Sequence, residues 1–188
     1  MMSLFTPDKF LISLMKLWQR VQFRPPMFSA TDLWRRARTV LICFPEEYRE
    51  RLAAEPAVRS IVEAFPKKRF FILTTKALPE RWLNVELIHL RGSDLNMFSL
   101  PNSDFIRFIQ DKAVDVAVDL WPSFNLTNAS ICRRSGAALR VGFGGEHAAS
   151  FYNLMIVPRG PEESLPRQYE AMAETILNLE RSEAQIEA

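Results

Sequence analysis

The sequence has few of the residues that usually mark a metal, redox or nucleotide site. Its two histidines, His89 and His147, lie far apart, and its two cysteines, Cys43 and Cys132, form no Cys-x-x-Cys motif. We therefore expect no metal site, and we expect two buried, reduced thiols of the kind found in a reducing compartment. Walker A, His-Glu-x-x-His and Gly-x-Ser-x-Gly motifs are absent from the chain. No cofactor is implied.

Long apolar runs and a strong charge imbalance are also missing. No apolar stretch reaches the roughly 18–20 residues that a membrane-spanning helix needs, and no signal-peptide pattern is evident at the N-terminus. The net charge is +2, with 48% hydrophobic and 24% charged residues among 188. This balance is typical of one folded domain of ordinary size, and it argues against disorder and against a dedicated nucleic-acid binder.

An amphipathic helix is predicted near the N-terminus, within a segment that we place at residues 1–36. Its apolar residues recur at steps of three and four: Phe10, Leu14, Leu17, Trp18 and Val21. Lys9, Lys16 and Arg20 occupy other positions. Two interpretations stay open. The helix packs on its own domain or on a partner chain, or residues 5–24 make a peripheral contact with an acidic membrane surface.

Residues 37–180 alternate between apolar runs and amphipathic segments, and a polar tail follows at 181–188. The expected strands are residues 39–44, 69–74, 85–90, 115–120, 139–143 and 153–157. The helices between them fall near 31–38, 45–65, 103–112, 124–136 and 164–182, and Pro56 is expected to break or restart the second of these. The pattern predicts a single Rossmann-like α/β domain, with a mostly parallel sheet covered by helices on both faces.

Ligands of open parallel sheets bind beyond the carboxyl ends of the strands. That rule selects the segment "PEEYRER" after the first strand, Asp119, Trp121 and Ser123 after the fourth, and Gly142 near the end of the fifth. Asp119 could bind a sugar hydroxyl, or it could cap the following helix or turn. The stretch "GFGGE" lacks the spacing of a dinucleotide fingerprint and favours a flexible turn.

Two stretches resemble a known family. In "VDVAVDLWPSFNLTNASICRRSGAALRVGF" the matching residues are Asp119, Leu120, Gly136, Ala137, Arg140, Gly142 and Phe143. In "TVLICFPEEYRERLAAEPAVRSIVEAFPKKRFFIL" they are Pro56, Ala57, Val58, Arg59, Phe65 and Pro66. In order and spacing these motifs resemble the N-terminal half of family-nine glycosyltransferases, the ADP-heptose:lipopolysaccharide heptosyltransferase group. The resemblance spans about residues 39–180.

The resemblance implies one acceptor-binding half of a two-domain GT-B enzyme. The family carries a Gly-Asp pair after the first strand, whose carboxylate is proposed as general base. Arg49 and Glu50 stand in that register here, so Glu50 is the implied base, with a longer side chain and without the preceding glycine. Asp119, Trp121, Ser123 and Gly142 become candidate acceptor-binding residues. The resemblance covers the acceptor-binding half and no donor-binding half, so we expect no sugar transfer by the isolated chain.

Three functions follow from these observations. The first is a split or degenerate glycosyltransferase half in envelope polysaccharide assembly, with a sugar acceptor as its partner. It would be cytoplasmic, and any membrane contact would be at the inner face of the bacterial inner membrane. The second is a noncatalytic module of the same fold that binds a protein partner. The third, ranked last, is a small nucleotide-binding enzyme.

Overall fold

The computed structural model describes residues 29–76, 85–158, 160 and 163–181. They form one sheet of six parallel strands in the order β3-β2-β1-β4-β5-β6. The strands are β1 (Thr39–Cys43), β2 (Arg69–Thr74), β3 (Val85–His89), β4 (Val116–Asp119), β5 (Leu139–Phe143) and β6 (Leu154–Ile156). The expected Rossmann-like fold is confirmed. Every strand predicted from the sequence is present, with ends that differ by at most one residue.

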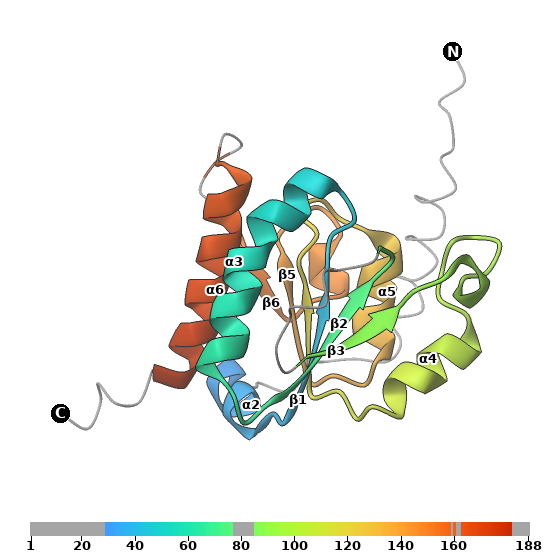
Figure 1. Ribbon diagram of the computed structural model, residues 1–188, viewed down its shortest axis with the longest axis horizontal. Helices are drawn as coiled ribbons and strands as arrows, with labels where there is room; N and C mark the ends of the chain where they lie inside the picture. Colours follow the sequence, from blue (N-terminus) through green and yellow to red (C-terminus); the bar gives the residue numbers. More distant parts are fainter. Residues whose placement is uncertain (1–28, 77–84, 159, 161–162, 182–188) are drawn as a thin grey trace, which may run out of the picture.

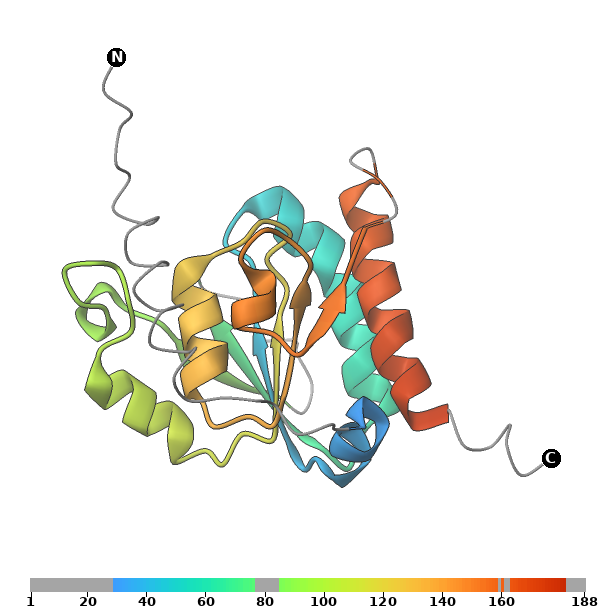
Figure 2. The ribbon, with the colours of Figure 1, turned by 180° about the vertical axis from the view of Figure 1, so that it is seen from behind.

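Helices cover both faces of the sheet (Figures 1 and 2). One face carries α2 (Ala30–Arg36), α3 (Tyr48–Ala64) and α6 (Leu165–Arg181), and the other carries α4 (Ser103–Gln110) and α5 (Leu126–Arg134). Two short 3-10 turns, η1 (Gly92–Asp94) and η2 (Ala148–Ser150), complete the connections. Because both faces are buried, the strands consist of nearly continuous apolar runs rather than alternating ones.

The N-terminal segment is described only from residue 29 onward. Within it, α2 is capped by the Ser29 side chain, which accepts a hydrogen bond from the backbone N–H of Asp32. Trp34 of this helix is fully buried in the core beside Phe65, with ring centroids 5.0 Å apart. The amphipathic helix predicted at residues 5–24 lies outside the described residues.

The prediction that Pro56 interrupts a helix was wrong. The helix α3 continues from Tyr48 to Ala64 with Pro56 inside it. A proline in a helix interior costs about 3 kcal/mol, because it removes a donor and crowds the preceding turn. The buried face of α3, with Val58 and Ile61, packs on the sheet and along α6 (Figure 1). Burial of each such side chain contributes about 1.5–3 kcal/mol, which offsets the local penalty.

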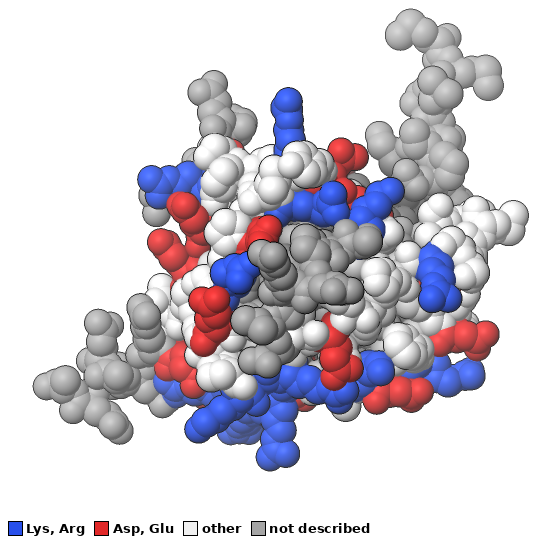
Figure 3. Space-filling view, viewed as in Figure 1, with Lys and Arg blue, Asp and Glu red and all other residues white. Residues whose placement is uncertain are grey.

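Exposed cations gather where the strands begin. Arg36 ends α2, Arg38 precedes β1, and Lys67 and Arg69 flank the start of β2. Figure 3 shows Lys and Arg side chains along this lower edge of the molecule. The carboxyl ends of the strands, where ligands of such sheets bind, lie at the opposite edge.

Candidate functional site

A cavity of about 530 Å³ opens at the carboxyl ends of the strands. It lies beyond β1, β2 and β3, and the start of α5, which follows β4, forms another wall. The sheet order reverses direction between β1 and β4, so the cavity straddles the switch point of the topology. Open α/β sheets bind their ligands at that point.

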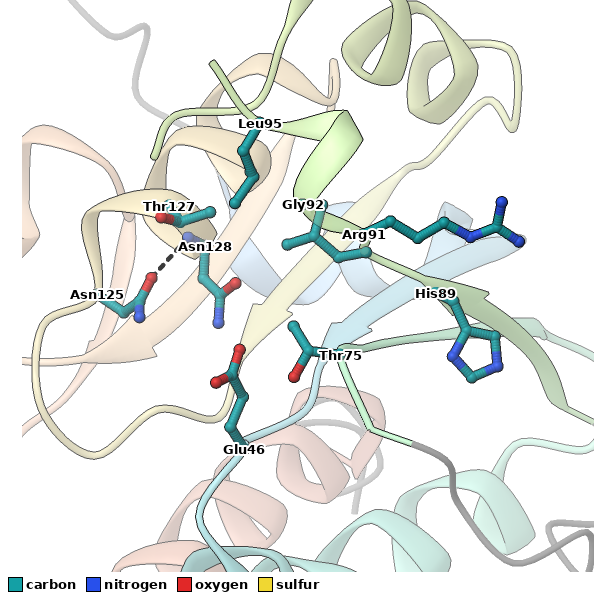
Figure 4. Close-up of a pocket in the computed structure, with 10 residues that line it drawn as sticks. Glu46, Thr75, His89, Arg91, Gly92, Leu95, Asn125, Thr127 and Asn128 are labelled. Carbon is teal, nitrogen blue, oxygen red and sulfur yellow. Dashed lines mark hydrogen bonds between the residues drawn. The ribbon is translucent and has the colours of Figure 1, made fainter. Parts of the chain in front are cut away.

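Hydrogen-bonding side chains converge in this cavity (Figure 4). Glu46, in the loop after β1, points toward Asn128 of α5, and Thr75 stands beside it after β2. Asn125 caps α5 by accepting a 3.0 Å hydrogen bond from the Asn128 backbone N–H, which fixes the wall. One carboxylate, one hydroxyl and amide groups in close range form a donor and acceptor set that suits a polyhydroxylated ligand.

Two other groups occupy the outer rim. His89 ends β3 and Arg91 follows it, and both side chains are exposed. In Figure 4 the imidazole and the guanidinium point away from the centre of the cavity. The interior of the site is therefore set by Glu46, Thr75 and the two asparagines rather than by a cation.

Asp119 lies just behind this wall. It ends β4 with an exposed fraction of 2%, and it accepts hydrogen bonds from the Tyr152 hydroxyl at 2.5 Å and from the Trp121 backbone N–H at 3.1 Å. Burial raises the pKa of Asp119 to about 7, although the bonds from Tyr152, Trp121 and Asn128 favour the ionised form. Because Asn128 also lines the cavity, the charge of Asp119 is linked to the site through that amide.

Gly142 makes the Asp119–Tyr152 contact sterically feasible. A Cβ atom at this position would lie 2.7 Å from Cδ2 and Cε2 of the Tyr152 ring. The ring therefore packs flat on the β5 backbone, and its hydroxyl reaches across to Asp119 on the neighbouring strand β4. Two residues selected from the sequence, Asp119 and Gly142, are brought together by a tyrosine that the sequence did not single out.

The remaining candidates lie apart from the cavity. Trp121 contributes its backbone N–H to Asp119, while its side chain is half-buried, and Ser123 is exposed in the loop before α5. Glu50 lies in the first turn of α3, and burial raises its pKa, with a further rise from the charge of Glu47. The residues described along the cavity wall do not include Trp121, Ser123 or Glu50. The cavity is lined by Glu46, four residues before Glu50, and not by the residue in the register that the resemblance implies for a base.

The two cysteines meet beside Asp119. Cys43 and Cys132 are both buried and free, with their sulfur atoms 3.7 Å apart. The hydrogen bond with Cys132 and burial both raise the pKa of the Cys43 thiol well above its ordinary value. Protonated, buried thiols are poor nucleophiles, so the pair packs here as small apolar groups. The predicted burial of both thiols is confirmed.

The described part of the chain contains neither a metal-ligand cluster nor a membrane-spanning helix. No group of three potential metal ligands comes together there. In the same residues, no helix is long and apolar enough to cross a membrane.

Comparison with known proteins gives a structural likeness. No family model matches the chain, and no curated protein matches it in sequence. Among solved structures it is similar to the E. coli heptosyltransferase WaaC with ADP, with a TM-score of 0.50 and 18% identity. The likeness covers 72% of this chain and 46% of WaaC, so the chain spans less than half the length of that enzyme. At this identity the likeness establishes the fold, which matches part of a heptosyltransferase.

Four residues of the site were missed by sequence reasoning. Glu46 lay within the highlighted segment "PEEYRER", but the family register drew attention to Glu50. Asn125 and Asn128 fall within the helix predicted at 124–136, and Thr75 directly follows the strand predicted at 69–74. A usable signal was present, because each of these polar residues lies within a few positions of a strand's carboxyl end or at a helix start that faces it.

Proposed function

We propose that this chain is the acceptor-binding half of a heptosyltransferase-like glycosyltransferase linked to lipopolysaccharide assembly, and that it transfers no sugar on its own. The observation that carries the proposal is the polar cavity at the switch point between β1 and β4. The likeness to part of WaaC supports the choice of reaction class. The acceptor-side position in a longer enzyme rests on the sequence motifs around Asp119 and Pro56.

In this proposal the acceptor sugar lies against Glu46, Thr75 and Asn128. The Glu46 carboxylate accepts hydrogen bonds from sugar hydroxyls, and it is the group placed to take a proton from the attacking hydroxyl when a donor-binding domain is present. Asp119 and Gly142 act behind the wall by holding Tyr152 and Asn128 in place. Trp121 supports Asp119 through its backbone.

Glu46→Gln should weaken binding of a deacylated lipopolysaccharide core oligosaccharide by about tenfold to a hundredfold. Hydrogen bonds to a charged group contribute about 1.5–3 kcal/mol, and each 1.4 kcal/mol corresponds to a factor of ten. Calorimetry of the full chain measures the change. Glu47→Gln is the matched control, since Glu47 is the adjacent exposed carboxylate outside the cavity lining.

Glu50→Gln distinguishes the two registers in the same assay. We expect its affinity to equal that of the unchanged chain, because Glu50 lies on the α3–α6 side of the domain, near Tyr169, whose pKa is raised by burial and further by the Glu50 charge. If Glu50→Gln loses binding and Glu46→Gln binds normally, the binding carboxylate is Glu50, as the family resemblance implies. No binding by the unchanged chain would remove the acceptor role altogether.

The isolated chain should neither bind ADP-heptose tightly nor turn it over with the same oligosaccharide. The physical reason is that the chain spans less than half of the heptosyltransferase it resembles, so the groups that hold a nucleotide sugar are expected from a second domain. A coupled assay for ADP release measures turnover, and calorimetry measures binding. Turnover that disappears in Glu46→Gln or Glu50→Gln would show that the chain is a complete enzyme.

A noncatalytic protein-binding role is the second candidate. It is favoured by Tyr48 and Leu52, which are 66% and 53% exposed and lie four residues apart on one face of α3. Two results together would favour this role over the first. The chain would fail to bind the oligosaccharide, and it would form a defined complex with a protein partner that Tyr48→Ser/Leu52→Ser disrupts.

Membrane contact through residues 5–24 stays a proposal, together with a location at the inner face of the bacterial inner membrane. Lys9, Lys16 and Arg20 of this segment would be attracted to acidic lipid. If these cations hold the segment at a membrane, the full chain should bind anionic vesicles, and added salt should abolish that binding. No binding to such vesicles would contradict the proposal.

A further inference from the structure

A second, smaller cavity adjoins the site. It measures about 270 Å³, and its lining consists of residues 98–100, in the loop between β3 and α4, and residues 124–127, at the start of α5. Asn125 and Thr127 also line the cavity of about 530 Å³, so the two cavities meet at these residues. We call the two the small cavity and the large cavity.

The boundary between the two cavities offers a donor and an acceptor in fixed positions. The Asn125 side-chain oxygen accepts a hydrogen bond from the Asn128 backbone N–H at 3.0 Å as the cap of α5, so the NH2 group of the same amide is not needed by the cap and can donate. The Thr127 hydroxyl donates its hydrogen to the Ser99 carbonyl at 2.7 Å, and its oxygen can therefore only accept a further bond. A ligand hydroxyl, which both donates and accepts, matches this pair.

Two aromatic residues form part of the small cavity wall. Phe124 is half-buried, and its ring is held by two others, with centroids 5.7 Å away in His147 and 5.4 Å away in Phe151. Phe98 contributes from the loop, where its backbone N–H donates to the Asn96 side chain at 2.9 Å. The Phe124 ring and the Phe98 backbone are therefore positioned before a ligand binds, which lowers the entropic cost of binding.

No ionisable side chain is among the described residues that line the small cavity. Its lining consists of aromatic, aliphatic, hydroxyl and amide side chains. The large cavity differs, because Glu46, His89 and Arg91 are among its lining residues. A phosphate or carboxylate group placed in the small cavity would lose water without gaining a counter-charge, which is unfavourable. The lining therefore favours a neutral group.

We propose that the small cavity is a subsite for one neutral sugar unit of the acceptor, next to the unit held by the large cavity. A pyranose ring has a face of C–H groups, whose partial positive charge suits the negative face of an aromatic ring such as Phe98 or Phe124. Its hydroxyl groups lie at the rim, where the Asn125 amide donates and the Thr127 oxygen accepts. Sites for drug-sized ligands measure about 300–1,000 Å³, so a cavity of about 270 Å³ suits a single ring. The choice of a sugar rests on the proposed function, and its neutral charge rests on the lining.

Phe98→Leu should weaken binding of the deacylated lipopolysaccharide core oligosaccharide to the full chain by about threefold to tenfold. Leucine keeps an apolar side chain at this 52% exposed position but has no aromatic face, so the stacking contact is lost while the fold is kept. Calorimetry measures the affinity, and thermal unfolding checks the fold. Phe108→Leu is the matched control, because Phe108 is 44% exposed on α4 and is not among the residues that line either cavity.

Saturation-transfer NMR with the same oligosaccharide identifies the sugar unit in the small cavity. In this experiment magnetic saturation passes from the protein to the ligand protons that contact it. The unit whose C–H signals lose saturation in Phe98→Leu, but keep it in Phe108→Leu, is the one that packs on Phe98. We expect that unit to carry neither a phosphate nor a carboxylate group.

Undiminished affinity in Phe98→Leu would overturn the proposal, as would an equal loss in Phe108→Leu or a charged sugar unit at Phe98. The results also separate this proposal from the proposed function. If Glu46→Gln weakens binding and Phe98→Leu does not, the subsite is wrong and the proposed function stands. If Phe98→Leu weakens binding and Glu46→Gln does not, the sugar lies in the small cavity and the role given to Glu46 is wrong. No binding by the unchanged chain would contradict both proposals.

Discussion

The protein should be less stable at pH 8 than at pH 5, and Asp119→Asn should remove most of that difference. Burial raises the pKa of Asp119 to about 7 from an ordinary value of 3.8. Between these values the folded state keeps a proton on Asp119 that the unfolded chain has released. The contribution to stability is therefore full below about pH 4, falls as pH rises to about 7, and is constant above. A shift of this size corresponds to about 4 kcal/mol.

Denaturant unfolding of both proteins at several pH values measures this effect. The asparagine keeps one oxygen to accept from the Trp121 N–H, and its amide NH2 group, in place of the second oxygen, can donate to the Tyr152 hydroxyl oxygen. It cannot ionise, so the stability of this variant should vary less between pH 4 and 7. Asp111→Asn changes an exposed carboxylate after α4 and is the control. Equal pH slopes for the unchanged protein and Asp119→Asn would contradict the burial of an ionisable group at this point.

Gly142→Ala should destabilise the fold by about 2–4 kcal/mol. The added methyl would lie 2.7 Å from two carbons of the Tyr152 ring, and the ring is too well packed to move freely, with an exposed fraction of 5%. Overpacking of a buried site costs about 1–3 kcal/mol, and loss of the hydrogen bond to Asp119 adds a similar amount.

Chemical denaturation at pH 8, where Asp119 is ionised and most needs its tyrosine, measures the change. Gly145→Ala is the matched control, because a Cβ there meets open space. Both glycines lie within four positions of each other, so a difference between the variants reports the packing of Tyr152. Similar stabilities would show that the ring has room to move away from β5.

The likeness to a heptosyltransferase concerns the fold, and the position of the cavity concerns the proposed function. The likeness to part of WaaC concerns the chain trace, since sequence identity is 18%. The cavity concerns particular side chains, above all Glu46, whose role can be tested independently of ancestry. If Glu46→Gln weakens binding of the oligosaccharide, the acceptor role rests on the chemistry of the cavity and not on the likeness of the fold.

The sequence by itself determined the architecture. Strands buried on both faces must be apolar along their length, and the helices between them must be amphipathic, so their alternation specifies a parallel sheet before any contact is known. It also pointed to the edge of the sheet where the cavity lies, through Asp119 and the segment after β1. These conclusions depend on local patterns of a few residues, which a linear sequence carries in full.

Only the tertiary structure decided which side chains meet. Pro56 lies within a continuous helix because packing against α6 and the sheet outweighs a local penalty. Asp119 is bonded to Tyr152, 33 positions away, and Gly142 clears the space for that ring. Glu46 lines the cavity, while Glu50, in the first turn of α3, lies near Tyr169 of α6. Such choices depend on distances between segments that are remote in sequence, and no local periodicity encodes them.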